Sequence, residues 1–389
     1  ITRYVDKEDG SEYIYSLFVP SDASTAFPVF DQPDLKARFT LTVRTPFDWL
    51  SISNTDAPQR FAMDPGAPIT SIFEETKPIS TYVFAFAAGP FEKVTGGNLS
   101  GREGVSSPPN KNTLPTGRVS ASGVSSPHVS KGSTSRNDNV EPLLTVGLQT
   151  PETSIYVRKS QAAKFKPHAA EVFRLNREAV KYFEEYFDYK FPFSKYDLVL
   201  IPEFPFGGME HAGATFLRES AIIFPQEPTK NDHISRALLI FHEASHQWFG
   251  DTVTMRWFDD LWLKEGFATF TAYKAMEKTM SEMNAWKVFY ERVKQAAYQT
   301  DSTKGTTPIY QEIPNLSAAK SAYGNIVYNK APAFLRQAEF YLGEDKFQTA
   351  VRAFLKKYEF GNAGWEDLVK EFGTATNSNL TDWARTWVK

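Results

Sequence analysis

Apolar and polar positions alternate along the first hundred residues in the way expected of β-strands. The segments "EYIYSLFV", "KARFTLTVRT", "WLSISN" and "TYVFAFAAGPF" are rich in β-branched and aromatic residues, and Pro, Asp and Gly separate them. We therefore predict that residues 11 to about 96 form an antiparallel β domain.

The period of the apolar positions becomes helical near residue 160. In "AAEVFRLNREAVKYFEEYF" they recur three and four residues apart, which predicts a helix. A short buried strand, "YDLVLIP", follows, and then two helices: "SRALLIFHEASHQWFG", closed by Gly250, and "DLWLKEGFATFTAYKAMEK", capped by Asp259. The chain is predicted to have an α+β multidomain fold, with an N-terminal β domain over residues 1–158 and a mainly helical domain over 159–389.

One segment of the β domain differs from the rest in composition. Residues 97–140 lose almost every large apolar side chain and fill with Ser, Gly, Pro and Asn, so they cannot bury enough surface to become ordered. We predict a flexible insertion without chemistry, followed by the strand-like segments "LLTVGLQT" and "SIYVRKS".

Composition excludes several classes of function. The 389-residue chain is long for one core, and its net charge of -3, with no lysine and arginine block, argues against nucleic-acid binding. The absence of cysteine excludes disulfides and cysteine-based catalysis or zinc sites. No apolar run approaches the roughly eighteen residues of a membrane span, and the first residues alternate like a strand instead of resembling a signal peptide. Cellular compartment and oligomeric state stay open.

The sequence "HEASH" carries the clearest chemistry. His242 and His246 lie one helical turn apart on the same face, where two imidazoles can bind one metal ion. A catalytic zinc ion needs a third protein ligand, and Glu265 meets that need on the apolar face of the following helix. Glu243 lies on the flank of the first helix, where a general base can take a proton from water. Lys264 is expected to be a solvated surface charge.

The stretch "GGMEHAGATF", residues 207–216, has two interpretations. It is either a surface turn, in which glycines supply permissive backbone angles, or a segment that holds a ligand. The residues alone do not decide between them.

Together these motifs resemble the M1 family of zinc metalloaminopeptidases. "HEASHQWFGDTVTMRWFDDLWLKEGFATF" resembles the zinc signature of that family, and "GGMEH" resembles its GxMEN exopeptidase motif. The resemblance extends to "FVPSDASTAFPVFDQPDLKARFTL", "ETKPISTYVFAFAAGPFE" and "YNKAPAFLRQAEFYLGEDKF", and so covers nearly the whole chain apart from the insertion. It implies a thermolysin-like catalytic domain and a fragment or short form that lacks the start of the first domain and the C-terminal helical domain.

The resemblance also implies roles for individual residues. His242, His246 and Glu265 would bind one zinc ion, and Glu243 would be the general base. The substrate-binding residues would be Glu210, which anchors the free α-ammonium group of a peptide, its neighbours Gly207, Gly208, Met209 and His211, and the pocket residues Phe206 and Tyr323. Tyr328 would stabilise the tetrahedral intermediate.

Four positions depart from the family pattern, and one of them is Ala331, where the family usually has Gly. His211 stands where the family has Asn, which introduces a residue that can titrate near neutral pH and predicts weaker substrate positioning or an added pH dependence. Leu17 and Val19 stand where many members have Gln and Glu that also bind the substrate amine.

The leading hypothesis is therefore a zinc aminopeptidase acting on peptides with a free N-terminus. A metalloendopeptidase of the same fold is one alternative, because the lost amine-binding residues would weaken recognition of the chain end. A catalytically silent peptide-binding module is the other.

Overall fold

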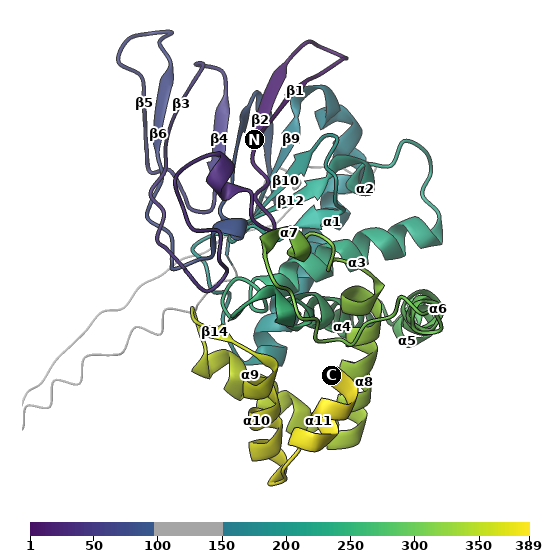
Figure 1. Cartoon of the computed structure of the whole chain (residues 1–389). Coiled ribbons are helices and arrows are strands. Elements are labelled where there is room, and N and C mark those ends of the chain that lie inside the picture. Colours follow the sequence, from purple (N-terminus) through teal and green to yellow (C-terminus); the bar gives the residue numbers. More distant parts are fainter. Residues whose placement is uncertain (97–150) are drawn as a thin grey trace, which may run out of the picture. The chain divides into compact units, whose positions relative to one another are not determined.

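The computed structural model describes residues 1–96 and 151–389 (Figure 1). The predicted insertion at 97–140 and the strand-like segment "LLTVGLQT" lie outside these residues. In the described ranges, no helix combines the length and the apolar character needed to cross a bilayer.

The N-terminal region folds into two antiparallel sheets, as the alternating pattern predicts. One sheet has four strands in the order β1-β2-β7-β4, and the other has three in the order β3-β6-β5. Alternate residues of "EYIY" are buried, so that Tyr13 and Tyr15 enter the core while their neighbours do not. The strands are β1 (Thr2–Val5), β2 (Glu12–Tyr15), β3 (Thr42–Thr45), β4 (Leu50–Ser53), β5 (Gln59–Phe61), β6 (Ile69–Ile72) and β7 (Phe86–Gly89).

A third, five-stranded sheet has strands from both sides of the predicted boundary near residue 158. Its order is β11-β12-β10-β9-β8, with β10 parallel to β9 and β12 and with antiparallel pairs at both edges. The strands are β8 (Phe91–Thr95), β9 (Ser154–Arg158), β10 (Asp197–Ile201), β11 (Gly208–Met209) and β12 (Ala214–Arg218). The two proposed domains thus share a sheet, and the boundary at residue 158 stays a prediction. Gly208 and Met209 of the "GGMEH" motif form the edge strand β11.

Three long helices form the centre of the second region: α1 (Ala162–Phe187), α3 (Lys230–His246) and α4 (Trp262–Thr279). Helix α3 packs against both α1 and α4. It begins with a capping box in which Thr229 and Asp232 bond each other's backbone N–H groups. Helix α4 is buried almost all around, because α3, α5 (Ala285–Phe289), α8 (Ala331–Leu342) and β13 (Thr254–Met255) pack against it. The fold class is therefore as predicted, an N-terminal β region followed by a mainly helical domain.

The remaining elements continue to the C-terminal end of the chain. They are α2 (Glu219–Ile222), β13 (Thr254–Met255), α5 (Ala285–Phe289), α6 (Gln295–Asp301), α7 (Leu316–Ala319), a π-helical turn (Ile326–Lys330), α8 (Ala331–Leu342), α9 (Glu344–Lys357), β14 (Asn362–Ala363), α10 (Trp365–Thr376) and α11 (Thr381–Val388).

Two predicted helix ends are wrong. Helix α3 ends at His246, four residues before Gly250, because the chain turns there and the Gly250 N–H donates to the Val253 carbonyl. Asp259 does not cap α4, which follows directly on a 3-10 turn. Its carboxylate instead accepts hydrogen bonds from the Ile313 N–H and the Tyr310 hydroxyl.

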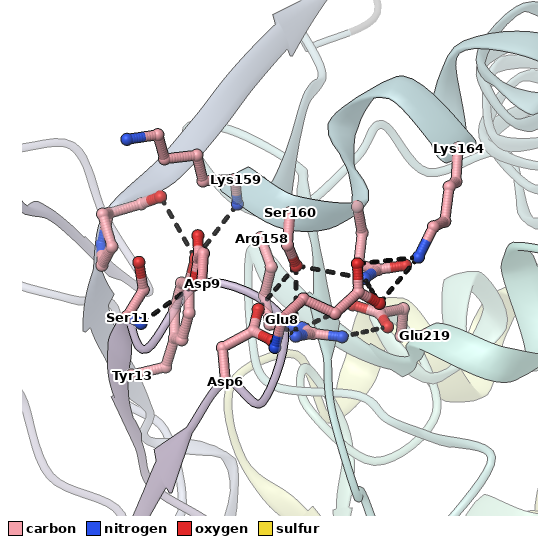
Figure 2. Close-up of polar contacts among 12 residues, drawn as sticks. Asp6, Glu8, Asp9, Ser11, Tyr13, Arg158, Lys159, Ser160, Lys164 and Glu219 are labelled. Atoms are coloured by element: carbon pink, nitrogen blue, oxygen red, sulfur yellow. Dashed lines mark hydrogen bonds and ion pairs between the residues drawn. The ribbon is translucent and has the colours of Figure 1, made fainter.

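A buried ion-pair cluster joins the N-terminal hairpin to the five-stranded sheet (Figure 2). Arg158, the last residue of β9, donates to Asp6 after β1 and makes a bidentate pair with Glu219 at the start of α2, with distances of 2.6 and 2.9 Å. The Ser160 hydroxyl donates to Asp6 at 2.5 Å. These four residues are called the Arg158 cluster below. Bidentate pairing of this kind is strong and directional, so it holds the three segments in one arrangement.

Candidate functional site

A cavity of about 520 Å³ lies between α3, α4, β11 and the π-helical turn. It is lined by Val19, Phe206, Gly207, Gly208, Met209, Glu210, Leu238, Leu239, His242, Glu243, His246, Lys264, Glu265, Thr269, Ala272, Tyr273, Arg292, Val293, Tyr323, Tyr328 and Asn329. All the site residues predicted from the sequence are among them except His211.

Three of these residues converge as metal ligands would. The two histidine Nε2 atoms are 3.0 Å apart, and each lies 3.3 Å from the same Glu265 oxygen. For a tetrahedral ion bound at 2.0–2.1 Å, adjacent ligand atoms would be about 3.3 Å apart. The residues therefore fit a metal ion in both donor type and spacing, and His242, His246 and Glu265 form a candidate metal site.

Hydrogen bonds orient the two imidazoles. His246 Nδ1 is 2.9 Å from the Phe249 carbonyl oxygen. A carbonyl only accepts, so Nδ1 carries the proton and the Nε2 lone pair is directed to the cluster. His242 Nδ1 lies 3.3 Å from the Thr269 hydroxyl on α4. Such partners fix the ring orientation before any ion binds.

Glu243 lies beside this cluster and is buried. Burial, reinforced by the charges of Glu210 and Glu265, raises the pKa of the Glu243 carboxyl well above its usual range. Gly208 on β11 provides the space that this side chain occupies: a Cβ at residue 208 would lie 2.5 Å from Glu243 Oε1. The glycine in the motif is thus explained by close packing against the adjacent helix.

Lys264 contradicts its predicted place on the surface. Its side chain is only 2% exposed, and its ammonium group lies 2.5 Å from Glu210 Oε1 and 3.1 Å from Glu265 Oε1. The rings of Tyr82 and Tyr323 face the same nitrogen at 4.6 and 5.6 Å. The ammonium group can stay charged in this buried position because the two carboxylates compensate its charge.

Negative charge dominates the electrostatics of the cavity. Burial alone would lower the pKa of His246, but the carboxylates of Glu210 and Glu265 outweigh it and raise that pKa to about 9. The same field that favours a proton on His246 favours a metal cation beside it.

The segment that carries Glu210 is fixed to the end of helix α3, which carries His242 and His246. Gln247 follows α3 directly; its side chain donates to the Glu210 carbonyl at 3.2 Å and accepts from the Gly213 N–H at 2.9 Å. Glu210 is buried to 3% exposure, and its carboxylate lines the cavity. The motif is therefore not a surface turn.

His211, the next residue, lies behind this wall. It is completely buried, its ring packs against Phe216 at 4.5 Å between centroids, and neither ring nitrogen has a hydrogen-bond partner in the described part of the chain. Burial lowers the pKa of His211 to about 3. The residue stays neutral at ordinary pH, so the expected titration near neutrality is wrong.

Two tyrosines and a phenylalanine complete the wall. Tyr328, in the π-helical turn, has its ring 6.2 Å from the His242 ring between centroids, and Tyr323 precedes the turn. Burial and the Glu265 charge raise the pKa of Tyr328 well above its usual range, so its hydroxyl remains a hydrogen-bond donor. Phe206 is 43% exposed and lies at the cavity wall.

Lys264 is the main site residue that sequence reasoning missed. A signal for it exists: in "DLWLKEGFATF" the lysine lies among mostly apolar residues, so this part of the helix has no broad polar face that would hold it at the surface. A lysine in such a helix needs a carboxylate partner. The sequence does not say which one.

Comparison with known proteins identifies similar sequences for both regions. A family profile described as "Peptidase family M1 domain" matches residues 172–387, and one described as "Peptidase M1 N-terminal domain" matches residues 1–83.

Curated relatives match over almost the whole chain. "Aminopeptidase N" of Streptomyces lividans is 32% identical over 100% of this chain and 39% of its own length. "Probable aminopeptidase 1" of Sulfurisphaera tokodaii is 30% identical over 99% of the chain and 42% of its own length. "Leucyl aminopeptidase" of Saccharolobus solfataricus is 28% identical over 95% and 40%, respectively. The chain spans about two fifths of the length of these relatives.

Proposed function

The chain belongs to peptidase family M1, and we propose that it acts as a zinc aminopeptidase, which hydrolyses the first peptide bond of peptides with a free N-terminus. The observation that carries the proposal is the convergence of His242, His246 and Glu265 directly beside the buried Glu243. Relatives named aminopeptidases support the same activity.

His242, His246 and Glu265 would hold the ion. Two imidazole nitrogens and a carboxylate oxygen are a donor set that zinc prefers, and three protein ligands leave a position free for substrate. A zinc ion bound there supplies Lewis acidity, which polarises the carbonyl of the scissile bond and makes water more acidic.

Glu243 would be the general base. Water adds to the carbonyl carbon of the first peptide bond as Glu243 takes one of its protons. The protonated Glu243 then gives that proton to the amide nitrogen as the carbon–nitrogen bond breaks. The raised pKa of Glu243 favours the first step, because a more basic carboxylate accepts a proton from water more readily.

Tyr328 would donate a hydrogen bond to the oxyanion that forms during this addition. Its phenol stays protonated, and donors directed at developing negative charge are among the strongest contributions to catalysis.

Recognition of the substrate would fall to β11 and its neighbours. Glu210 would hold the α-ammonium group, and the backbone of Gly207, Gly208 and Met209 would pair with the peptide as an added strand, since β11 is the edge strand of its sheet. Phe206 and Tyr323 would contact the first side chain.

Release of 4-nitroaniline from a panel of aminoacyl 4-nitroanilides, with and without a chelator, tests the proposal. We expect release that the chelator abolishes and that added zinc restores. No chelator-sensitive release from any member of the panel would overturn it. Product analysis on a peptide separates the endopeptidase alternative, because an aminopeptidase releases single residues from the N-terminus and an endopeptidase releases internal fragments.

A further inference from the structure

The Lys264 ammonium group lies where it competes for the proposed substrate anchor. It lies 2.5 Å from Glu210 Oε1, and Glu265 and the rings of Tyr82 and Tyr323 hold it from other sides. With a side chain only 2% exposed, it has no route to turn into solvent when a substrate arrives. Its positive charge is therefore a fixed part of the cavity wall.

Among the described residues that line the cavity, Glu210 is the only anionic side chain left for a substrate ammonium group. Among the described residues, the carboxylates that line the cavity belong to Glu210, Glu243 and Glu265. Glu243 is assigned to proton transfer and Glu265 to the metal. One of the two Glu210 oxygens already accepts a hydrogen bond from Lys264.

The described part of the N-terminal β region places no further acceptor side chain in the cavity lining. In the described ranges, its only residue in the cavity lining is Val19, whose side chain is apolar. An incoming α-ammonium group would thus meet one shared carboxylate, with another ammonium group close by.

We propose that Lys264 is a specificity-determining residue, which shares Glu210 with the α-ammonium group of the substrate and so sets how strongly the protein prefers free over blocked N-termini. The proposal rests on the proposed aminopeptidase function. Two like charges on one carboxylate repel each other, and close charges in a site of low dielectric constant are coupled strongly. Lys264 consequently weakens the preference for a free amine that Glu210 alone would impose.

The ratio of kcat/KM for a free peptide to kcat/KM for its N-acetylated form tests this directly. In Lys264→Met the Glu210 carboxylate loses its lysine partner, and the ammonium group of the substrate takes the place of the lysine ammonium group. We expect the ratio to rise about tenfold, mainly through a lower KM for the free peptide, which corresponds to one strong charge interaction. Any loss of metal or of folded protein lowers both values equally and cancels in the ratio.

Helix α4 offers a matched control. Lys274 is also a buried lysine between two carboxylates, Glu339 at 2.6 Å and Glu344 at 2.8 Å, but it does not line the cavity. Lys274→Met should leave the ratio unchanged. Lys264→Arg keeps the positive charge and should also keep the ratio of the unaltered protein. An unchanged or smaller ratio in Lys264→Met would overturn the proposal and assign Lys264 a merely structural role.

A measurement on the unaltered protein covers the case in which Lys264→Met does not fold. Leucinamide and 4-methylpentanamide differ only in the amine, and we expect their inhibition constants to agree within about tenfold. A preference for leucinamide of a hundredfold or more would contradict the proposal. Failure of the aminopeptidase function itself is distinct, because the unaltered protein would then show no chelator-sensitive release of N-terminal residues.

Discussion

Two buried cations in this protein, Arg158 and Lys264, each lie between two carboxylates, but their surroundings differ. Arg158 is surrounded by fixed partners: Asp6 and Glu219 accept its hydrogen bonds (Figure 2). The ring of Tyr4 covers its guanidinium group at 5.1 Å. Lys264 faces the 520 Å³ cavity, and its partner Glu210 faces it too. The first cation joins segments of the fold, whereas the second is part of a wall that a ligand contacts.

The surroundings of Arg158 and Lys264 also differ in how many carboxylates share a cavity. Around Lys264 three glutamates, Glu210, Glu243 and Glu265, line one cavity; burial, reinforced by the charges of the other two, raises the pKa of Glu243, and the Glu210 and Glu265 charges raise that of His246. Arg158, Asp6 and Glu219 do not line this cavity. A buried cluster with uncompensated charge beside a cavity is thus a better indicator of function than a buried ion pair as such.

Glu243→Gln tests the cavity without affecting the Arg158 cluster, and it should have the largest effect of the four variants. The amide cannot accept the proton from water, so we expect kcat/KM on an aminoacyl anilide to fall by about a thousandfold or more. The variant should keep its zinc content and its unfolding temperature, since a buried carboxyl is replaced by a neutral group of the same shape. Activity within tenfold of the unaltered protein would remove Glu243 from the mechanism.

Arg158→Met should lower the stability of the protein and leave its activity unchanged. It leaves Asp6 and Glu219 buried without a cation, which we expect to lower the free energy of unfolding by about 3 kcal/mol, measured by urea denaturation. The kcat of the folded protein should be unchanged. Arg3→Met is the matched control on the same hairpin: its side chain is 64% exposed and pairs with Glu12 at the surface, so the loss should be far smaller than that of Arg158→Met. Equal losses in both variants would contradict the structural role of the Arg158 cluster.

Gly208→Ala should disturb the site without touching either cation. The new Cβ would lie 2.5 Å from Glu243 Oε1, and displacing that carboxylate should reduce kcat by roughly tenfold to a hundredfold. The effect is expected to act through Glu243, so adding Gly208→Ala to Glu243→Gln should cause little further loss. Additive losses in the double variant would show that residue 208 acts by another route.

His211→Leu should give the smallest effect, and it should depend on pH. The pKa of His211 is about 3 in the folded protein and about 6.5 when unfolded, so between these values the unfolded state binds one more proton. This difference lowers the stability of the unaltered protein as pH falls below about 6.5, and it amounts to about 1.4 kcal/mol between pH 7.5 and 5.5.

His211→Leu has no histidine at this position and therefore does not lose stability in this way as pH falls. Its stability relative to the unaltered protein, from urea denaturation, should therefore improve by that amount between pH 7.5 and 5.5. A constant difference across this range would show that His211 is not held neutral by burial.

The local periodicity of the sequence determined most of the candidate metal site. The spacing of His242 and His246 on one helix, and the inward position of Glu265 on the next, follow from a repeat of 3.6 residues, which acts within a few neighbours along the chain. The antiparallel character of the N-terminal region and the long helices α1, α3 and α4 follow from the same kind of rule. Family resemblance then identified Glu210 and Tyr328 as site residues, and both line the cavity.

Tertiary structure decided the rest, because burial depends on partners that are distant along the chain. Lys264 is buried because Glu210, 54 residues earlier, compensates its charge, and no local pattern contains that contact. His211 is neutral because Phe216 and the sheet exclude water from its ring. The sharing of one sheet by β8, β9 and β10 likewise depends on long-range pairing. Sequence alone thus determined which groups could bind a metal, and only packing decided which charge stands next to the substrate anchor.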